Sequence, residues 1–388
     1  MTLNEKIEKW LEDTTQKLDI SHLRLTKWPK QLIGKEHFIK TLNCNWNKLT
    51  SLPNNLTNLK TLNCHDNELT SLPNGLTELK ELCCSWNKLT SLTNNLTNLK
   101  TLDCSRNKLT SLPNNLTKLE TLRCPHNKLK FLPNNLTKLK ILNCSHNKLT
   151  SLLNNLTKLK ILNCSYNKLT SLPNNLHEVP GDFVPWTNLK TLYCSYTKLT
   201  SLPNNLINLK ILYCSNNELI SLPHDLIKLE MLYCSENELT SIPNNLTGLK
   251  ILHCDYNQLT SLPNNPTLKE LVCFNNKLIS LPNNLTRLND LDCSWNKLTS
   301  LPNNLTKLKE LNCSGNKLFS NELEKWKKIW LISIRHQHIL RTAGIKRVVK
   351  VLKNRLYLPS LNELREELIW SPNHPGKFFI SLPRIGQW

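Results

Sequence analysis

A cysteine recurs about every 20 residues through most of this chain of 388 residues, and this spacing constrains the fold more than any other feature. The series runs through Cys44, Cys64, Cys84, Cys104, Cys124, Cys144, Cys164, Cys194, Cys214, Cys234, Cys254, Cys273, Cys293 and Cys313. The step is 20 residues except for 30 before Cys194 and 19 before Cys273. A fixed period of this length is typical of a solenoid, because one such repeat cannot bury an apolar face alone.

Each repeat has the pattern of one short strand. Leu62 and Cys64 alternate with the polar residues Thr61, Asn63 and His65, which predicts a strand with one buried face. The following segment Ser-Leu-Pro-Asn turns the chain, because proline fixes φ and lacks a backbone donor. The residues left before the next strand are too few for a packed helix and two turns. We therefore expect an extended or polyproline-type return on the convex side.

The pattern Leu-x-x-Leu-x-Cys-x-x-Asn-x-Leu, followed by Leu-Pro-x-x-Leu, resembles the leucine-rich repeat over about residues 18–318. The repeat length is similar to that of short bacterial-type repeats in secreted effector proteins. The Cys-bearing, Asn- and Lys-rich composition is similar to that of leucine-rich repeat proteins of mimivirus-type giant viruses. The resemblance implies an α/β solenoid of horseshoe form with about fifteen repeats, and a concave face that binds a protein partner.

In most repeats, an asparagine lies three residues after the cysteine. A buried amide that lacks partners costs roughly 1–3 kcal/mol, so we expect these side chains to bond the loop backbone of neighbouring repeats. Thr197 and Leu23 depart from the pattern, which predicts two looser repeats. The row consists of Asn47, Asn67, Asn87, Asn107, Asn127, Asn147, Asn167, Asn217, Asn237, Asn257, Asn276, Asn296 and Asn316.

The fourteen repeat cysteines are expected to pack as small hydrophobic side chains, with only Cys83 facing the other way. Metal ligation or a series of disulfides is the alternative, although parallel strands would place these thiols side by side without closing a cage. We expect no metal and no cofactor, and a reducing compartment follows from the free thiols. The charged amino terminus does not have the pattern of a signal peptide, and no apolar run is long enough to span a membrane. The sequence thus favours the cytoplasm, which would be that of the host cell for a viral protein.

Three regions are expected. Residues 1–17 predict an amphipathic capping helix in which Thr2 and Glu5 have capping-box spacing. Residues 18–318 form the repeat array, with an insertion at 177–186. Residues 319–388 hold 13 Lys or Arg against 5 Asp or Glu and predict three amphipathic helices that form a basic cap and an irregular tail. A basic docking module is the alternative interpretation of this last region.

The insertion contains two prolines and the two large aromatic residues Phe183 and Trp186, which indicates a structured excursion. Insertions in solenoids often border the binding face, so both aromatic residues are candidate partner contacts. A tolerated insertion without function is the alternative.

Aromatic residues in the repeats after the insertion suggest a recognition patch. Tyr193, Tyr213 and Tyr233 replace asparagine at the outward strand position, and His253 is next. Tyrosine is frequent at binding hot spots. The residues expected at the edge of the patch are Tyr196, Glu236 and Tyr256. Stacking between strands for stability alone is the alternative.

Two lysine rows flank the strands, and the net charge of the chain is +21. One row follows the leucine that enters the strand: Lys60, Lys80, Lys100, Lys140, Lys160, Lys190, Lys210, Lys250, Lys269 and Lys309. The other lies beside the asparagine: Lys88, Lys108, Lys128, Lys148, Lys168, Lys198, Lys277, Lys297 and Lys317. Glu218, Glu238 and Gln258 interrupt the second row. The rows are expected to keep the array soluble, and binding of a polyanion or nucleic acid is the alternative.

The sequence favours a non-enzymatic protein-binding scaffold. Effector proteins with similar short repeats carry a cysteine-dependent ubiquitin ligase domain after them, but no cysteine follows Cys313 here. We expect no catalytic residues. An adaptor that recruits partners for ubiquitin ligation is a further alternative. The identity of the partner, the pathway and the oligomeric state have no signature in these residues.

Overall fold

A computed structural model describes residues 1–173 and 186–318, which fall into two compact units, Met1–Glu218 and Leu219–Trp388. The helices predicted after residue 318 and the insertion residues 174–185, Phe183 among them, lie outside the described residues.

The first unit begins with helix α1, Leu3–Glu12. The Thr2 hydroxyl accepts a hydrogen bond from Glu5 N, and the Glu5 carboxylate accepts one from Thr2 N, so the predicted capping box is present. The helix buries Ile7 and Trp10. It packs against strand β1, Leu18–Asp19, and the 3-10 helix η1, Lys30–Leu32. The helix therefore covers the edge of the first strand, which would otherwise be open to pairing.

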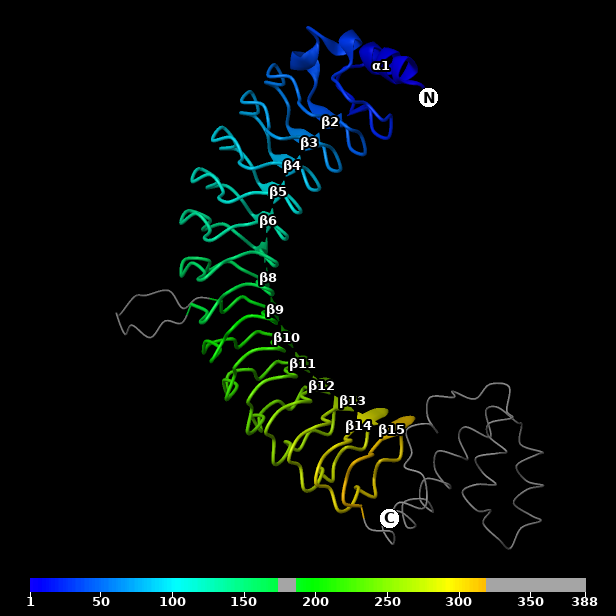
Figure 1. Ribbon diagram of the computed structural model, residues 1–388, viewed down its shortest axis with the longest axis vertical. Helices are drawn as coiled ribbons and strands as arrows, with labels where there is room; N and C mark the ends of the chain where they lie inside the picture. Colours follow the sequence, from blue (N-terminus) through cyan, green and yellow to red (C-terminus); the bar gives the residue numbers. More distant parts are fainter. Residues whose placement is uncertain (174–185, 319–388) are drawn as a thin grey trace, which may run out of the picture. The chain divides into compact units, whose positions relative to one another are not determined.

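Every repeat contributes one short strand, and each strand pairs in parallel with its neighbour inside its unit (Figure 1). Directly before strand β2, a second 3-10 helix, η2, spans Glu36–Phe38. The later strands of the first unit are β2 (Thr41–Asn43), β3 (Thr61–Asn63), β4 (Glu81–Cys83), β5 (Thr101–Asp103), β6 (Thr121–Arg123), β7 (Ile141–Asn143), β8 (Ile161–Asn163), β9 (Thr191–Tyr193) and β10 (Ile211–Tyr213). The second unit contains β11 (Met231–Tyr233), β12 (Ile251–His253), β13 (Glu270–Val272), β14 (Asp290–Asp292) and β15 (Glu310–Asn312).

This arrangement is the predicted solenoid with one parallel strand in each repeat. Between β2 and β15 the described return segments contain turns and no helix, as expected. The strand register is kept where the period changes. Ile161 of β8 pairs with Thr191 of β9 across the longer step, and Ile251 of β12 pairs with Glu270 of β13 across the shorter one. Both irregularities are therefore absorbed outside the strands.

The core consists of leucines and the repeat cysteines. All fourteen repeat cysteines are buried and free, whereas Cys83 is only half-buried, which confirms the predicted orientation of both kinds. In the first repeat, which lacks a cysteine, Leu18 and Ile20 occupy the equivalent core positions with 0% exposure. Because the side chains of each repeat pack on those of the next, the apolar area is buried between repeats rather than within one.

The asparagine row bonds the loop backbone as predicted. The Asn67 side-chain nitrogen donates to the carbonyls of Cys44 and Cys64, at 3.0 and 3.2 Å. The Asn67 side-chain oxygen accepts from Leu49 N at 3.0 Å. The same pattern recurs at Asn127, which bonds Cys104 O, Cys124 O and Leu109 N. Each amide thus joins two consecutive repeats, and its own polar atoms are satisfied.

Thr197 interrupts this row. Its hydroxyl donates to Cys194 O at 3.1 Å, but it leaves Leu169 N, the equivalent of Leu49 N, without an acceptor in the described part of the chain. Leu169 is completely buried, so this repeat contact lacks one hydrogen bond that its neighbours have. At the other departure, Leu23 N donates to the Asn47 side-chain oxygen at 3.1 Å.

A second asparagine row, which the sequence analysis did not identify, lies on the return side. Asn95 Nδ2 donates to Asn74 O at 2.8 Å, and Asn155 and Asn245 make the same contact with the residue 21 positions earlier. The return segments are therefore joined by side-chain hydrogen bonds, since they lack the ladder of a sheet.

Candidate functional site

The exposed first and third residues of the short strands form what is here called the strand face. In the first unit Tyr193 and Tyr213 lie in register on it, with ring centroids 4.8 Å apart and planes at 28°. Both rings are half-buried. A stacked pair of this kind contributes about 0.5–1.5 kcal/mol beyond area burial. The pair presents two phenol groups on a surface whose neighbouring repeats carry mainly asparagine.

The strand face of the second unit has a different pair. Tyr233 and His253 lie in register with ring centroids 4.6 Å apart and planes at 57°. His253 Nε2 is 2.7 Å from a Glu270 carboxylate oxygen on the next strand. The tyrosine, the imidazole and the carboxylate therefore form a polar aromatic group across three strands.

Tyr196, Glu236 and Tyr256 lie in another row, which consists of the residue two positions after each repeat cysteine and is here called the loop row. Non-glycine residues in this row have φ between 50° and 58°. Their amides turn toward the next repeat, as in the bond from Tyr196 N to Ser215 O at 3.0 Å. The left-handed turn after each strand thus places one side chain of every repeat at the edge of the strand face.

Four consecutive loop-row side chains form an aromatic ladder that the sequence analysis missed. His126, His146, Tyr166 and Tyr196 stack with centroid distances of 4.1, 4.1 and 4.4 Å and interplanar angles of 10–12°. The two loop-row residues before the ladder also contact each other. The Arg106 guanidinium lies 4.3 Å from the ring centroid of Trp86. Their shared position two residues after each repeat cysteine is visible in the sequence and could have indicated the ladder.

The electrostatics of the ladder follow from its packing. Desolvation lowers the pKa of His126, and the His146 and Arg106 charges lower it further. Desolvation, followed by Arg106, also lowers the pKa of His146. Both imidazoles therefore bind a proton less readily than a free histidine does. Because the stacked rings cover each other's faces, the ladder exposes ring edges and hydroxyl groups rather than open aromatic faces.

Trp186 is not a surface residue, so its assignment as a partner contact is wrong. Its side chain has 0% exposure. Trp186 O accepts a hydrogen bond from Leu189 N at 2.9 Å, as Leu206 O does from Leu209 N. The tryptophan therefore takes the place of a core leucine at the end of the insertion.

Lysines on both sides of the strand face are exposed, and a few pair with glutamates of the preceding repeat. Lys88 lies 2.9 Å from Glu68, Lys140 lies 2.6 Å from Glu120, and Lys250 lies 2.6 Å from Glu230. Five consecutive lysines of the loop side have no ion pair in the described residues: Lys108, Lys128, Lys148, Lys168 and Lys198. Residues 98–173 contain 13 Lys or Arg against Asp103 and Glu120.

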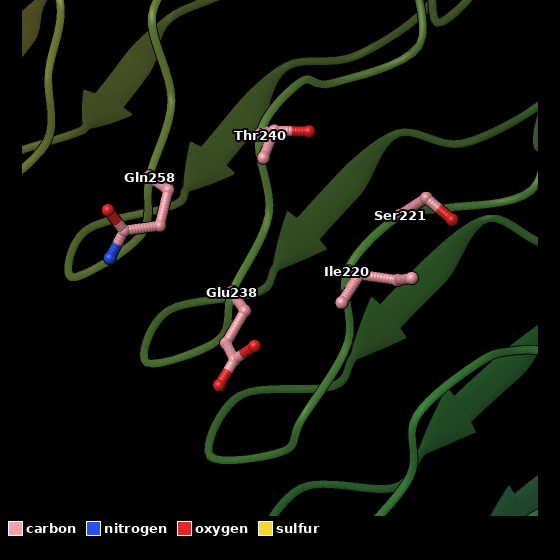
Figure 2. A pocket seen from close by; sticks show the side chains of 5 residues that line it. All are labelled: Ile220, Ser221, Glu238, Thr240 and Gln258. Carbon is pink, nitrogen blue, oxygen red and sulfur yellow. The ribbon is translucent and has the colours of Figure 1, made fainter.

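A shallow depression lies in the second unit, beside the strands, where Glu238 and Gln258 interrupt the lysine row (Figure 2). Ile220 and Ser221 contribute to it from one repeat, Glu238 and Thr240 from the next, and Gln258 from the one after that. All five side chains are exposed.

The repeat cysteines are chemically passive. Burial raises the pKa of Cys44 and Cys144 to about 12, and it raises the pKa of Cys64 well above the ordinary value. The half-buried Cys83 also has a raised pKa, because desolvation outweighs its hydrogen bond with Ser85. Thiols of this kind are protonated at neutral pH and are poor nucleophiles.

Within the described ranges, no group of three or more His, Cys, Asp or Glu residues is placed to hold a metal ion. Among the same residues, no helix has the length and apolar character needed to cross a membrane.

The comparisons with known proteins agree with this architecture. Residues 98–119 match the Leucine Rich Repeat family model. A leucine-rich repeat protein of Leptospira interrogans is 28% identical and has a TM-score of 0.68, with 83% of this chain and 96% of that chain covered. YopM, a leucine-rich effector protein from Yersinia pestis, is 28% identical with a TM-score of 0.60, covering 81% and 87%.

YopM from Yersinia enterocolitica is 25% identical with a TM-score of 0.55, and the match covers 81% of this chain and 86% of that chain. A comparison with curated protein sequences found no significant match. These findings support a leucine-rich repeat protein with repeats of about 20 residues.

Proposed function

We propose that this chain is a non-enzymatic scaffold that binds a protein partner through its strand face. The leucine-rich repeat fold is a typical protein–protein interaction scaffold. The observation that carries the proposal is the stacked pair of Tyr193 and Tyr213 on the strand face of the first unit. Large aromatic side chains on an otherwise polar surface are the usual anchors of an interface.

The energetics of the pair suit recognition. Stacking already restricts both tyrosines, so a partner that covers them loses little further side-chain entropy. The phenol groups can donate and accept hydrogen bonds while the rings bury apolar area. In the second unit, Tyr233 and the pair of His253 and Glu270 add a polar aromatic anchor of the same kind.

The proposal that the chain has no enzymatic activity rests on its thiols. Thirteen repeat cysteines have a pKa raised by desolvation, and none of these is available as a thiolate nucleophile at neutral pH. The neighbours that share the fold are mostly non-enzymatic interaction scaffolds.

Replacing Tyr193, Tyr213 and Tyr233 together by Ser is expected to lower the yield of bound partners strongly. The substitutions remove the aromatic anchors and leave the buried face of each strand unchanged. The measurement is affinity purification from the native cell, with wild type and variant compared by quantitative mass spectrometry. Replacing the loop-row residues Trp46 and Trp86 by Ser is the control, and it should leave the yield unchanged. Recovery of the same partners at equal yield from the triple variant would refute the role of the tyrosines.

Binding of a polyanion is the second candidate, and the five consecutive unpaired lysines favour it. Lys108 to Lys198 place one exposed ammonium in each repeat, and the surrounding repeats hold few acids to neutralise them. Such a row attracts an anionic chain by release of its counterions. The aromatic ladder beside it gives no platform for bases, because its ring faces are already stacked.

Retention on heparin and on single-stranded DNA tests this second candidate. We expect salt-dependent retention that weakens when Lys128, Lys148 and Lys168 are replaced by Gln, and that changes little when Lys277, Lys297 and Lys317 are replaced instead. No retention on either matrix at about 50 mM salt would remove the candidate.

We also propose a cellular compartment and an origin for the chain, from its buried thiols and from the resemblance of its repeats. Fourteen buried free thiols fit a reducing compartment such as the cytoplasm. The resemblance of the repeats to giant-virus proteins would place the chain in the host cytoplasm. An adaptor role in ubiquitin ligation remains a variant of the scaffold proposal in which the bound partner is a ligase component.

A further inference from the structure

The depression in the second unit combines an apolar side chain with a negative charge. Ile220 is 61% exposed, and it lies four residues after the loop row, at a position where most repeats carry threonine. Glu238 of the next repeat and Gln258 of the following one border the same depression, as Figure 2 shows. An exposed isoleucine and a carboxylate therefore occur side by side on the surface.

The charge at Glu238 has no counter-ion. No ion pair involves Glu238 in the described part of the second unit. Later repeats of that unit carry lysines at the position equivalent to Glu238. Those lysines are Lys277, Lys297 and Lys317. In a row of this kind, a cationic group is repelled at the lysine positions and attracted where Glu238 and Gln258 replace them.

The second unit also contains a natural counterpart of the depression. Ile279 occupies the same repeat position as Ile220 and is 64% exposed. The residues equivalent to Ser221 and Thr240 are Ser280 and Thr299, so these positions are unchanged. The residues equivalent to Glu238 and Gln258 are Lys297 and Lys317. The two places therefore differ in sequence at two of five positions, and both differences concern charge.

We propose that the depression at Ile220, Glu238 and Gln258 binds a lysine or arginine side chain of a protein partner. The aliphatic stem of such a side chain packs on Ile220, and its cationic head lies at the Glu238 carboxylate. Gln258, Ser221 and Thr240 add uncharged polar groups to the border of the depression, so Glu238 is its one charged contact. The site fixes the position of the partner along the array, because the equivalent place at Ile279 carries the opposite charge.

This inference deepens the proposed scaffold function, because it names the chemistry of one partner residue. Its test uses small probes and no partner protein. Equal partner yield from the tyrosine variant would therefore refute the partner-binding role of the strand face. A negative result with the small probes would refute only the cation site.

The test is a titration of the full chain, labelled at isoleucine methyl groups, with the amide of N-acetyl-arginine. The matched probe is the citrulline derivative, which has a similar shape and no charge. We expect the arginine probe to shift the Ile220 methyl signal and to leave the Ile279 signal nearly unchanged. An exposed ion pair corresponds to a difference of about two- to fivefold in apparent affinity between the two probes.

Two exchanges of residues between the places complete the design. Glu238→Lys with Gln258→Lys should abolish the arginine-dependent shift of Ile220. Lys297→Glu with Lys317→Gln should create a shift at Ile279. Both variants use residues that other repeats carry at the same positions, so folding is preserved. Equal shifts from the two probes, or equal shifts at Ile220 and Ile279 in the wild type, would overturn the proposal.

Discussion

Raising the pH from about 8 to about 10 is expected to unfold the repeat array, because the thiols ionise in the unfolded chain while burial keeps them protonated in the folded one. Desolvation raises the pKa of thirteen repeat cysteines above the ordinary thiol value of 9.0. For Cys44 and Cys144 the folded-state pKa is about 12, and for Cys313 it is about 11. The unfolded chain therefore loses these protons at a lower pH than the folded chain does.

The sign and size of the effect follow from proton linkage. A raised pKa in the folded state leaves stability intact below pH 9 and lowers it as the pH rises toward the folded-state value. Each fully buried thiol then costs about 1.4 kcal/mol of unfolding free energy per pH unit. Folded and unfolded protein usually differ by roughly 5–15 kcal/mol. Over about one pH unit, the summed loss of stability from thirteen such thiols exceeds this difference.

Urea unfolding followed by circular dichroism at several pH values, with a reductant present, measures this slope. The control replaces Cys104, Cys124 and Cys144 by Ala. That variant is less stable at neutral pH because cavities form, but its loss of stability per pH unit above pH 9 should be smaller by about 1.4 kcal/mol for each thiol removed. An unfolding free energy that stays constant from about pH 8 to about pH 10 would contradict burial of the thiols.

Asn127→Ala is expected to lower the unfolding free energy by about 2–4 kcal/mol, although it changes no apolar contact of the core. The substitution removes the bonds from Asn127 to Cys104 O and Cys124 O, and it leaves Leu109 N without its acceptor. Leu109 is completely buried, so water cannot replace the lost partner. The midpoint of urea unfolding measures the effect.

The repeat that already lacks this asparagine supplies the opposite experiment. Thr197→Asn should raise the unfolding free energy by about 1 kcal/mol, because it gives Leu169 N an acceptor. Thr200→Asn, on the exposed surface of the same repeat, is the control and should have little effect. A stabilised Thr200 variant, or an Asn127→Ala variant as stable as the wild type, would show that the row does not carry the bonds between repeats.

The fold could be predicted from the sequence because its physics is periodic. Leu62, Cys64 and Asn67 recur at one spacing, and each has one environment that suits it: two core positions and one buried amide between loops. The same logic predicted the half-buried Cys83, which lies on the other side of its strand. What the period could not supply was the backbone conformation within the return segments, and with it the second asparagine row at Asn95, Asn155 and Asn245.

The candidate site was only partly predictable. Tyr193 and Tyr213 lie in register because both occupy the third residue of a strand. Tyr196 lies in the loop row, because the left-handed turn after the strand changes the direction of its side chain. Trp186 was misassigned because the insertion obscures the register, although counting 20 residues back from the core residue Leu206 places it on a leucine position. Its surroundings, rather than its residue type, decide that it is buried.

Alkylation of the folded chain by a small uncharged thiol reagent at neutral pH, followed by peptide mass spectrometry, tests most directly whether neighbouring repeats share one buried core. We expect slow modification at Cys83 alone and no modification at the fourteen repeat cysteines until urea unfolds the protein. Rapid modification of several repeat cysteines in the folded chain, or disulfides between them, would contradict the shared core.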